Sequence, residues 1–188
     1  MMNEKLLKEL YRYNPEEESY NVDIELNDYR DVYSEWDYSP FINRDLDEDL
    51  LDYLMECSLE VSGKNKMIVN FFLPEYLYDK QREERSREGI RHYFSYRERK
   101  IKNGRWTLIR NSILFGLIGT FFLITSYLIE FYIKEQVALK LLSEGLMIGA
   151  WVAIWEIFSI VFFQVNEINT KLRHYKILKD LPIMYYYK

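Results

Sequence analysis

The apolar segment 145–163 carries one carboxylate, Glu156, and two tryptophans, Trp151 and Trp155. A charged side chain at the centre of a bilayer is costly, so we expect Glu156 to face protein or water rather than lipid. Rings of acidic side chains give pores a preference for cations. A glutamate hydrogen-bonded to a neighbouring helix is the open alternative. The candidate pore or gate residues are Glu156, Trp151, Trp155, Ser159 and Phe163.

The basic stretch 82–100, in which arginines alternate with aromatic side chains, is a second candidate site. Guanidinium groups bind phosphates and aromatic faces stack on bases, so this pattern predicts nucleotide or oligonucleotide binding. Contact with anionic lipid is the alternative. It fits the first arginines less well, because on a helix they would stand about 20 Å or more from the membrane. The candidate ligand residues are Arg82, Arg85, Arg91, His92, Tyr93, Tyr96 and Arg97.

Acidic side chains in segment 27–60 raise the question of catalysis or metal binding. Asp28, Asp31 and Asp37 could serve a membrane-bound hydrolase, although a solvated loop with Arg–Asp pairs explains them more simply. Asp45, Asp47, Asp49 and Glu56 have the spacing of a calcium loop, but Leu50 stands where the sharp turn needs glycine. Nucleotide-binding and hydrolase motifs are not found. We therefore expect neither enzymatic activity, nor a metal, nor a cofactor.

The charge of the chain is segregated into three blocks. Residues 1–80 hold 8 Lys and Arg against 20 Asp and Glu, residues 81–110 hold 10 against 4, and residues 111–188 hold 7 against 6. An acidic, a basic and an apolar block in succession are typical of proteins that meet a membrane or a nucleic acid. The one cysteine, Cys57, fits a reducing compartment.

Two apolar segments, 111–133 and 141–165, are each long enough to span a bilayer as a helix. The short connection 134–140 predicts an antiparallel hairpin. Several Lys and Arg residues precede the first segment and follow the second. Only two, Lys134 and Lys140, lie in the connection. The positive-inside rule therefore places both termini in the cytoplasm. Two buried core helices of a soluble protein would be the alternative.

Small residues form stripes on both expected spans. In the first span the stripe includes Ser126 and Glu130, and in the second two glycines form a G-x-x-x-G. Such stripes let helices approach closely in lipid, within one hairpin or between subunits. The glycines that we expect to pack are Gly116, Gly119, Gly145 and Gly149.

The residues before the first span predict a small α+β domain. We expect a weak helix over 3–13, strands over 20–26 and 65–73, and a helix over 44–61 with a capping box from Asp45 to Glu48. The fold class is then an α+β cytoplasmic N-terminal domain, with a small sheet and a covering helix, followed by a stalk helix and a transmembrane hairpin. So small a sheet would be marginal alone, which favours an oligomer. The expected domains are 1–76 acidic α+β, 77–110 basic stalk, 111–133 first span, 134–140 external loop, 141–165 second span and 166–188 cytoplasmic tail.

Segments "DYRDV", "WDYSPF", "RDLDEDLLDYLMECS" and "SEGLMIGAWVAIWE" resemble a pattern of bacterial two-span membrane proteins. The architecture is similar to that of effector subunits encoded beside nucleotidyltransferases in anti-phage systems, of the Hailong type and with SLATT-like spans. The resemblance implies a homo-oligomeric inner-membrane channel, for instance a tetramer. It would depolarise the cell when a nucleotide or short-DNA signal changes, with a nucleotidyltransferase encoded nearby as a partner. A membrane-anchored scaffold that recruits a cytosolic protein without forming a pore is the alternative.

Overall fold

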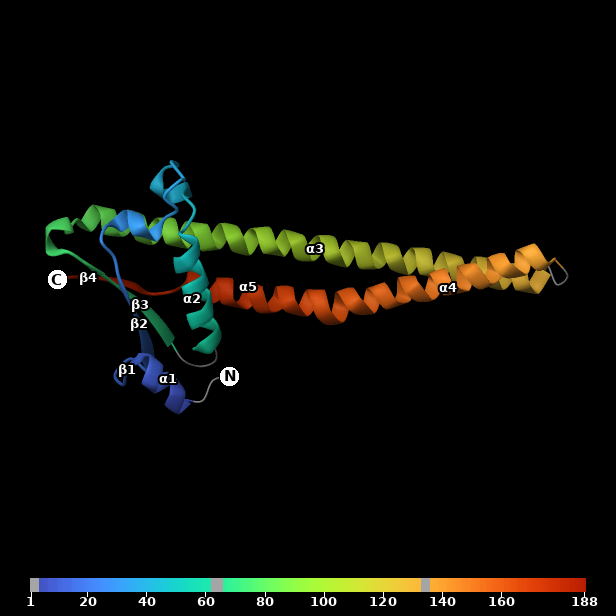
Figure 1. Ribbon diagram of the computed structural model, residues 1–188, viewed down its shortest axis with the longest axis horizontal. Helices are drawn as coiled ribbons and strands as arrows, with labels where there is room; N and C mark the ends of the chain where they lie inside the picture. The colour runs from blue at the N-terminus through green and yellow to red at the C-terminus, as the bar shows by residue number, and fades with distance from the viewer. Residues whose placement is uncertain (1–3, 62–65, 133–135) are drawn as a thin grey trace. The chain divides into compact units, whose positions relative to one another are not determined.

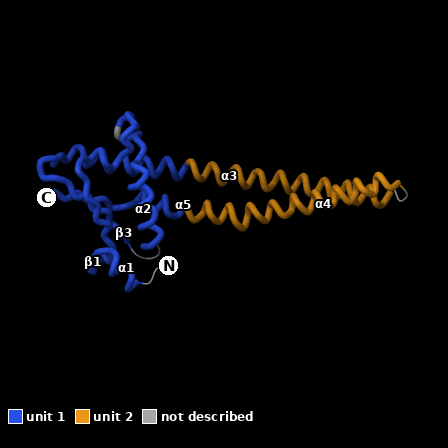
Figure 2. The backbone as a smooth tube through the Cα atoms, viewed as in Figure 1, with its two compact units in different colours: residues 1–99, 172–188 blue, residues 100–171 orange. Residues whose placement is uncertain are grey.

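The computed structural model describes residues 4–61, 66–132 and 136–188. The chain forms two compact units (Figure 2): residues 1–99 with 172–188, and residues 100–171. The first unit is an α+β fold built on a four-stranded mixed sheet, and the second is a pair of long helices (Figure 1). The first unit is called the sheet unit below and the second the hairpin unit.

Four strands form the sheet in the order β1-β2-β3-β4. They are β1 (Arg12–Asn14), β2 (Ser19–Glu25), β3 (Lys66–Leu73) and β4 (Ile183–Tyr187). The pair β1–β2 is antiparallel, and both β2–β3 and β3–β4 are parallel. The two strands expected from the sequence are confirmed to within one residue. The expected N-terminal helix is shorter, because α1 (Glu4–Leu10) gives way to β1.

The C-terminal residues are not the tail that the sequence suggested. Helix α5 (Val165–Lys179) follows the second long helix, and β4 then pairs with β3 from Val69 to Leu73. Parallel strands need a crossover connection, and the connection between β3 and β4 contains the whole hairpin unit. Residues on both sides of the hairpin therefore belong to one folded unit.

Helix α2 (Glu48–Glu60) links the parallel strands β2 and β3 and buries an apolar face formed by Leu50, Leu54 and Cys57. Its N-cap is Asp47, whose side chain accepts a hydrogen bond from the Leu50 backbone N–H, so the capping box predicted at Asp45 is wrong. Short 3-10 helices lie at Tyr29–Val32, Phe41–Asn43 and Glu75–Leu77. The core of the sheet unit is mostly aromatic and aliphatic and includes Tyr20, Val22, Val69, Phe71, Leu73, Phe94 and Leu178.

The hairpin unit pairs the second part of α3 (Lys80–Tyr132) with α4 (Val137–Ser159). Helix α3 continues through Gly104 without a break, and α4 begins inside the segment expected to be a loop. Residues 134 and 135 of that loop lie outside the described part. A π-helical turn, Ile160–Gln164, joins α4 to α5.

Two helical segments, Lys80–Tyr132 and Val137–Lys179, are long and apolar enough to cross a membrane. In their most apolar windows only 11% and 17% of the residues are buried. A core helix of a soluble protein would be mostly buried, so this exposure favours lipid, or further protein, around the hairpin.

Candidate functional site

Glu156 lies on the face of α4 that borders a groove between the two long helices. The groove has a volume of about 440 Å³ and is lined by Phe115, Ile118, Phe122, Gly149, Val152, Ala153 and Glu156. The Glu156 side chain is half-buried, and within the described residues its carboxylate has no hydrogen bond or ion pair. Every other lining side chain is apolar. One hairpin therefore leaves this carboxylate without a polar partner.

The other predicted pore residues are not brought into this groove. Trp151 and Trp155 are exposed on another side of α4, and Ser159 is half-buried. Phe163 is exposed and lies in the π-helical turn, where the Val165 N–H donates to the carbonyl of Ile160, five residues back. A π turn changes the angle per residue, so the simple helical spacing from Glu156 to Phe163 does not hold.

Three of the four expected packing glycines lie against the partner helix. A Cβ at Gly119 would stand 3.2 Å from Ala153 Cβ, and one at Gly116 would stand 3.6 Å from Ile157 Cδ1. A Cβ at Gly149 would meet the Phe122 ring at 3.0 Å. A Cβ at the fourth, Gly145, would meet no atom of the partner helix within 4 Å in the described part of the chain. The G-x-x-x-G of α4 therefore contributes only its second glycine to the hairpin.

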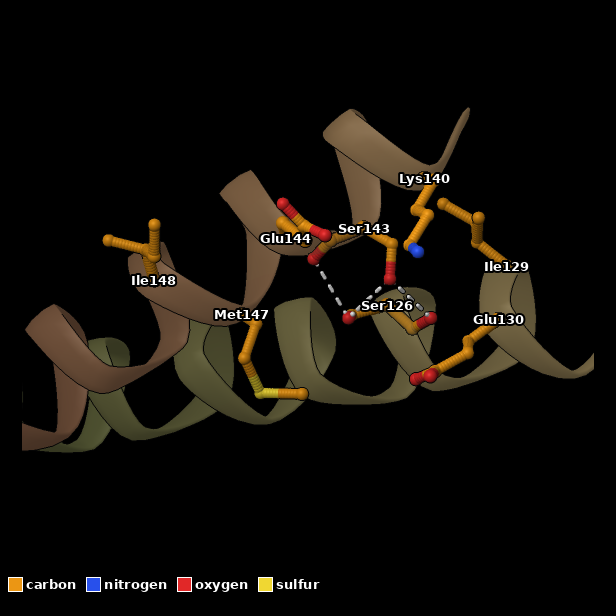
Figure 3. Close-up of a pocket in the computed structure, with 8 residues that line it drawn as sticks. All are labelled: Ser126, Ile129, Glu130, Lys140, Ser143, Glu144, Met147 and Ile148. Carbon is orange, nitrogen blue, oxygen red and sulfur yellow. Dashed lines mark hydrogen bonds between the residues drawn. The ribbon is translucent and has the colours of Figure 1, made fainter. Parts of the chain in front are cut away.

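A polar contact closes the hairpin near its connection (Figure 3). Ser126 Oγ donates to the Ser143 carbonyl at 2.9 Å, and Ser143 Oγ donates to the Ser126 carbonyl at 3.1 Å. Beside them opens a pocket of about 720 Å³, lined also by Ile129, Glu130, Lys140, Glu144, Met147 and Ile148. Sequence reasoning identified Ser126 and Glu130 but missed Ser143, because its partner is set by the register of the two helices.

The predicted ligand residues of the basic stretch divide among separate places on α3. Arg82 and Arg85 line a pocket of about 190 Å³ with Asp28, Tyr29, Arg30 and Ser86. Arg91 lines a smaller one with Arg87 and Lys179. His92, Tyr93 and Tyr96 line a third, of about 290 Å³, with residues 42–45. The stretch therefore does not form one continuous surface.

Arg97 packs against the end of α5 rather than toward a pocket. Its guanidinium lies 5.8 Å from the ring centres of both Tyr93 and Tyr175, and it donates a hydrogen bond of 3.3 Å to the Tyr175 hydroxyl. Burial raises the pKa of Tyr93. These contacts give Arg97 a structural role within the sheet unit.

The acidic residues of segment 27–45 organise the local backbone. Asp28 and Asp31 form the capping box of the 3-10 helix Tyr29–Val32. Asp37 accepts hydrogen bonds from the backbone N–H groups of Asp45 and Ser39, which lower its pKa. Across residues 4–61, 66–132 and 136–188, no group of three His, Cys, Asp or Glu side chains is placed to hold a metal ion.

Comparison of the chain with protein families, with curated proteins and with solved structures found no match.

Proposed function

We propose that the chain is a subunit of a homo-oligomeric channel of the bacterial inner membrane, gated by a nucleotide or short oligonucleotide that its sheet unit senses. The observation that carries this proposal is the unpaired carboxylate of Glu156 in the most apolar part of the chain. Such a side chain is costly in lipid, and one hairpin supplies it with no polar partner. Several copies around an axis would place it beside water, where a ring of carboxylates favours cations.

The folding of the sheet unit supports a two-span topology. Residues 80–99 precede the first span and residues 172–188 follow the second, and both belong to the sheet unit. A unit that folds from both flanks must lie on one side of the membrane. The excess of Lys and Arg in these flanks supports a cytoplasmic side for this unit.

The π-helical turn Ile160–Gln164 supports a moving part close to Glu156. Its backbone hydrogen bonds join residues five apart rather than four apart as in an α-helix. Such turns occur frequently at functional sites. A change in this turn would rotate the end of α4 against α5. Ligand binding in the sheet unit, which includes the end of α5, would then alter the surroundings of Glu156.

The sequence resemblance to two-span effectors supports the biological role. In that role the channel depolarises the membrane as part of anti-phage defence, and a nucleotidyltransferase encoded nearby makes the signal. Two separate pockets along the N-terminal part of α3 supply basic and aromatic side chains suited to such a ligand.

Ion flux through proteoliposomes containing the purified full chain tests the proposal. We expect the wild type to pass cations in preference to anions and Glu156→Gln to lose that preference. Glu167→Gln is the matched control, since Glu167 is exposed and pairs with Lys171 at 2.7 Å. A monomer in detergent, or unchanged selectivity in Glu156→Gln, would contradict a pore lined by this residue.

A membrane-anchored scaffold without a pore is the second candidate, and one feature favours it. Trp36 and Tyr38 are 82% and 99% exposed in the loop before α2. Large aromatic side chains are enriched in protein interfaces, so this loop suits a cytosolic protein partner. Proteoliposomes that stay tight to ions, with and without nucleotide, would favour the scaffold over the channel.

A further inference from the structure

The pocket at the start of α3 gathers three arginines from two parts of the sheet unit. Arg82 and Arg85 are one helical turn apart, so their side chains leave α3 on the same face. Arg30 reaches the same pocket from the 3-10 helix Tyr29–Val32. The sequence placed Arg30 in an acidic loop and gave no sign of this meeting.

The arginine pocket, lined by Asp28, Tyr29, Arg30, Arg82, Arg85 and Ser86, holds three arginines against one carboxylate. Arg82 pairs with Asp79 at 3.4 Å, and both side chains are well exposed, so the pair is weak. Neither Arg30 nor Arg85 has an ion pair in the described part of the chain. The Asp28 carboxylate is engaged by the backbone N–H of Arg30 at 2.9 Å.

Ser86 forms the buried floor of the arginine pocket. It lines the pocket, its side chain is 2% exposed, and Ser86 Oγ has no hydrogen-bond partner within the described residues. Ser86 Oγ is closed to solvent and lies beside the hydroxyls of Tyr33 and Tyr185, so it is no ligand itself. The three guanidinium groups above it would bind the phosphate oxygens with charge-assisted hydrogen bonds.

We propose that the arginine pocket binds the phosphate group of a small soluble phosphate ester, with Arg30, Arg82 and Arg85 on the phosphate oxygens and Ser86 beneath them. The pocket is too small for a whole nucleotide, so the remainder of the ligand would project from it. Tyr93 and Tyr96 line the next pocket about two helical turns further along α3, roughly 10 Å away. This assignment deepens the ligand-sensing part of the proposed function and rests on it only for the cytoplasmic location of the ligand.

Calorimetric titration of the detergent-solubilised full chain tests the site without any ion flux. Adenosine 5′-monophosphate is the probe, inorganic phosphate the competitor and adenosine the phosphate-free control. We expect saturable binding of the monophosphate, competition by phosphate and no binding of adenosine. Arg85→Gln should weaken binding about tenfold or more, and Arg30→Gln should weaken it several-fold. Arg99→Gln, an exposed arginine of α3 outside the pocket, should bind as the wild type does.

Three results would overturn the proposal. The first is no binding of the monophosphate or of inorganic phosphate at millimolar concentration. The second is an equal effect of Arg85→Gln and Arg99→Gln, which would indicate a general charge effect. The third is displacement of the probe by phosphatidic acid in nanodiscs, which would identify a lipid headgroup as the occupant. Glu156→Gln should keep full binding, so failure of the channel and failure of this site are distinguishable.

Discussion

Tyr187 in β4 donates a hydrogen bond of 2.6 Å to the Glu83 carboxylate in α3, although 104 residues separate them. Arg87 pairs with the same carboxylate at 2.9 Å, and the Tyr29 hydroxyl lies 2.6 Å from that of Tyr187. Burial raises the pKa of Tyr187, so the phenol remains a donor at neutral pH. This network attaches the C-terminal strand to the first turns of α3, beside the arginine pocket.

Removal of the Tyr187 hydroxyl should weaken the sheet unit. We expect Tyr187→Phe to lower the free energy of unfolding by about 1–3 kcal/mol, because the nearly buried Glu83 carboxylate loses a donor. Thermal unfolding of the full chain in detergent, followed by near-ultraviolet circular dichroism, measures the change.

Tyr186→Phe is the matched control for this prediction. Tyr186 is the neighbouring residue in β4, is exposed, and stacks on Phe72 with ring centres 5.3 Å apart. The stack survives the loss of the hydroxyl, so the stability should stay near that of the wild type. Equal losses of stability in Tyr187→Phe and Tyr186→Phe would show that the hydrogen bond from Tyr187 to Glu83 does not stabilise the sheet unit.

The sequence predicted the local elements of the sheet unit better than their pairing. The strands at 20–26 and 65–73 are confirmed because each has a run of apolar or alternating residues. Strand β4, "IMYYY", was missed because residues 166–188 were expected to be a tail, and the partner strand β3 lies before the whole hairpin in the sequence. No local pattern specifies a pairing across so long a connection.

The candidate sites show the same division. Arg82 and Arg85 were identified from composition, but Arg30 and Ser86 complete their pocket only through tertiary contacts. Glu156 was identified as the one carboxylate of its apolar segment. The groove beside it is completed by phenylalanines of α3, whose register against α4 the helical period alone does not fix.

The corrected helix cap makes a second prediction. Asp47→Ala should lower the free energy of unfolding by about 1 kcal/mol, because the Leu50 N–H loses its side-chain acceptor. Asp45→Ala, which removes the same charge two residues earlier, should cost less. Urea unfolding of both variants measures the difference. A larger loss of unfolding free energy in Asp45→Ala than in Asp47→Ala would contradict this prediction and would favour Asp45 as the N-cap.

The serine contact of the hairpin makes a third prediction. Ser126 Oγ and Ser143 Oγ lie 2.9 Å apart, so cysteines at both positions should form a disulfide under mild oxidation. In a Cys57→Ser background, Ser126→Cys with Ser143→Cys should give a faster-migrating monomer on non-reducing gels.

The control for the disulfide is Thr125→Cys with Ser143→Cys, since Thr125 is half-buried and its hydroxyl donates instead to the Phe121 carbonyl of its own helix. This pair should remain reduced within one chain. A covalent dimer from the Ser126 and Ser143 pair would contradict the hairpin, because it would place Ser126 against another subunit.

His174 makes the fourth prediction, on the pH dependence of stability. Ser58 Oγ donates to the Met55 carbonyl at 2.8 Å and lies 3.1 Å from His174 Nδ1, so Nδ1 carries the ring proton and donates to Ser58. His174 Nε2 is buried without a partner within the described residues. Burial, and secondarily the neighbouring Arg173, lowers the pKa of His174 below its ordinary value of 6.5.

The folded chain therefore takes up this proton less readily than the unfolded chain does. Stability should be unaffected by His174 above about pH 7 and should fall as the pH drops below about 6.5, before most carboxylates titrate near pH 4. His174→Gln should flatten that fall in the thermal midpoint, because no group is left to take up the proton. His92→Gln, an exposed histidine of α3, should keep the wild-type slope. If the thermal midpoint of His174→Gln fell with pH as steeply as that of the wild type, the prediction would be wrong. Protonation of the buried His174 ring would then carry no cost in stability.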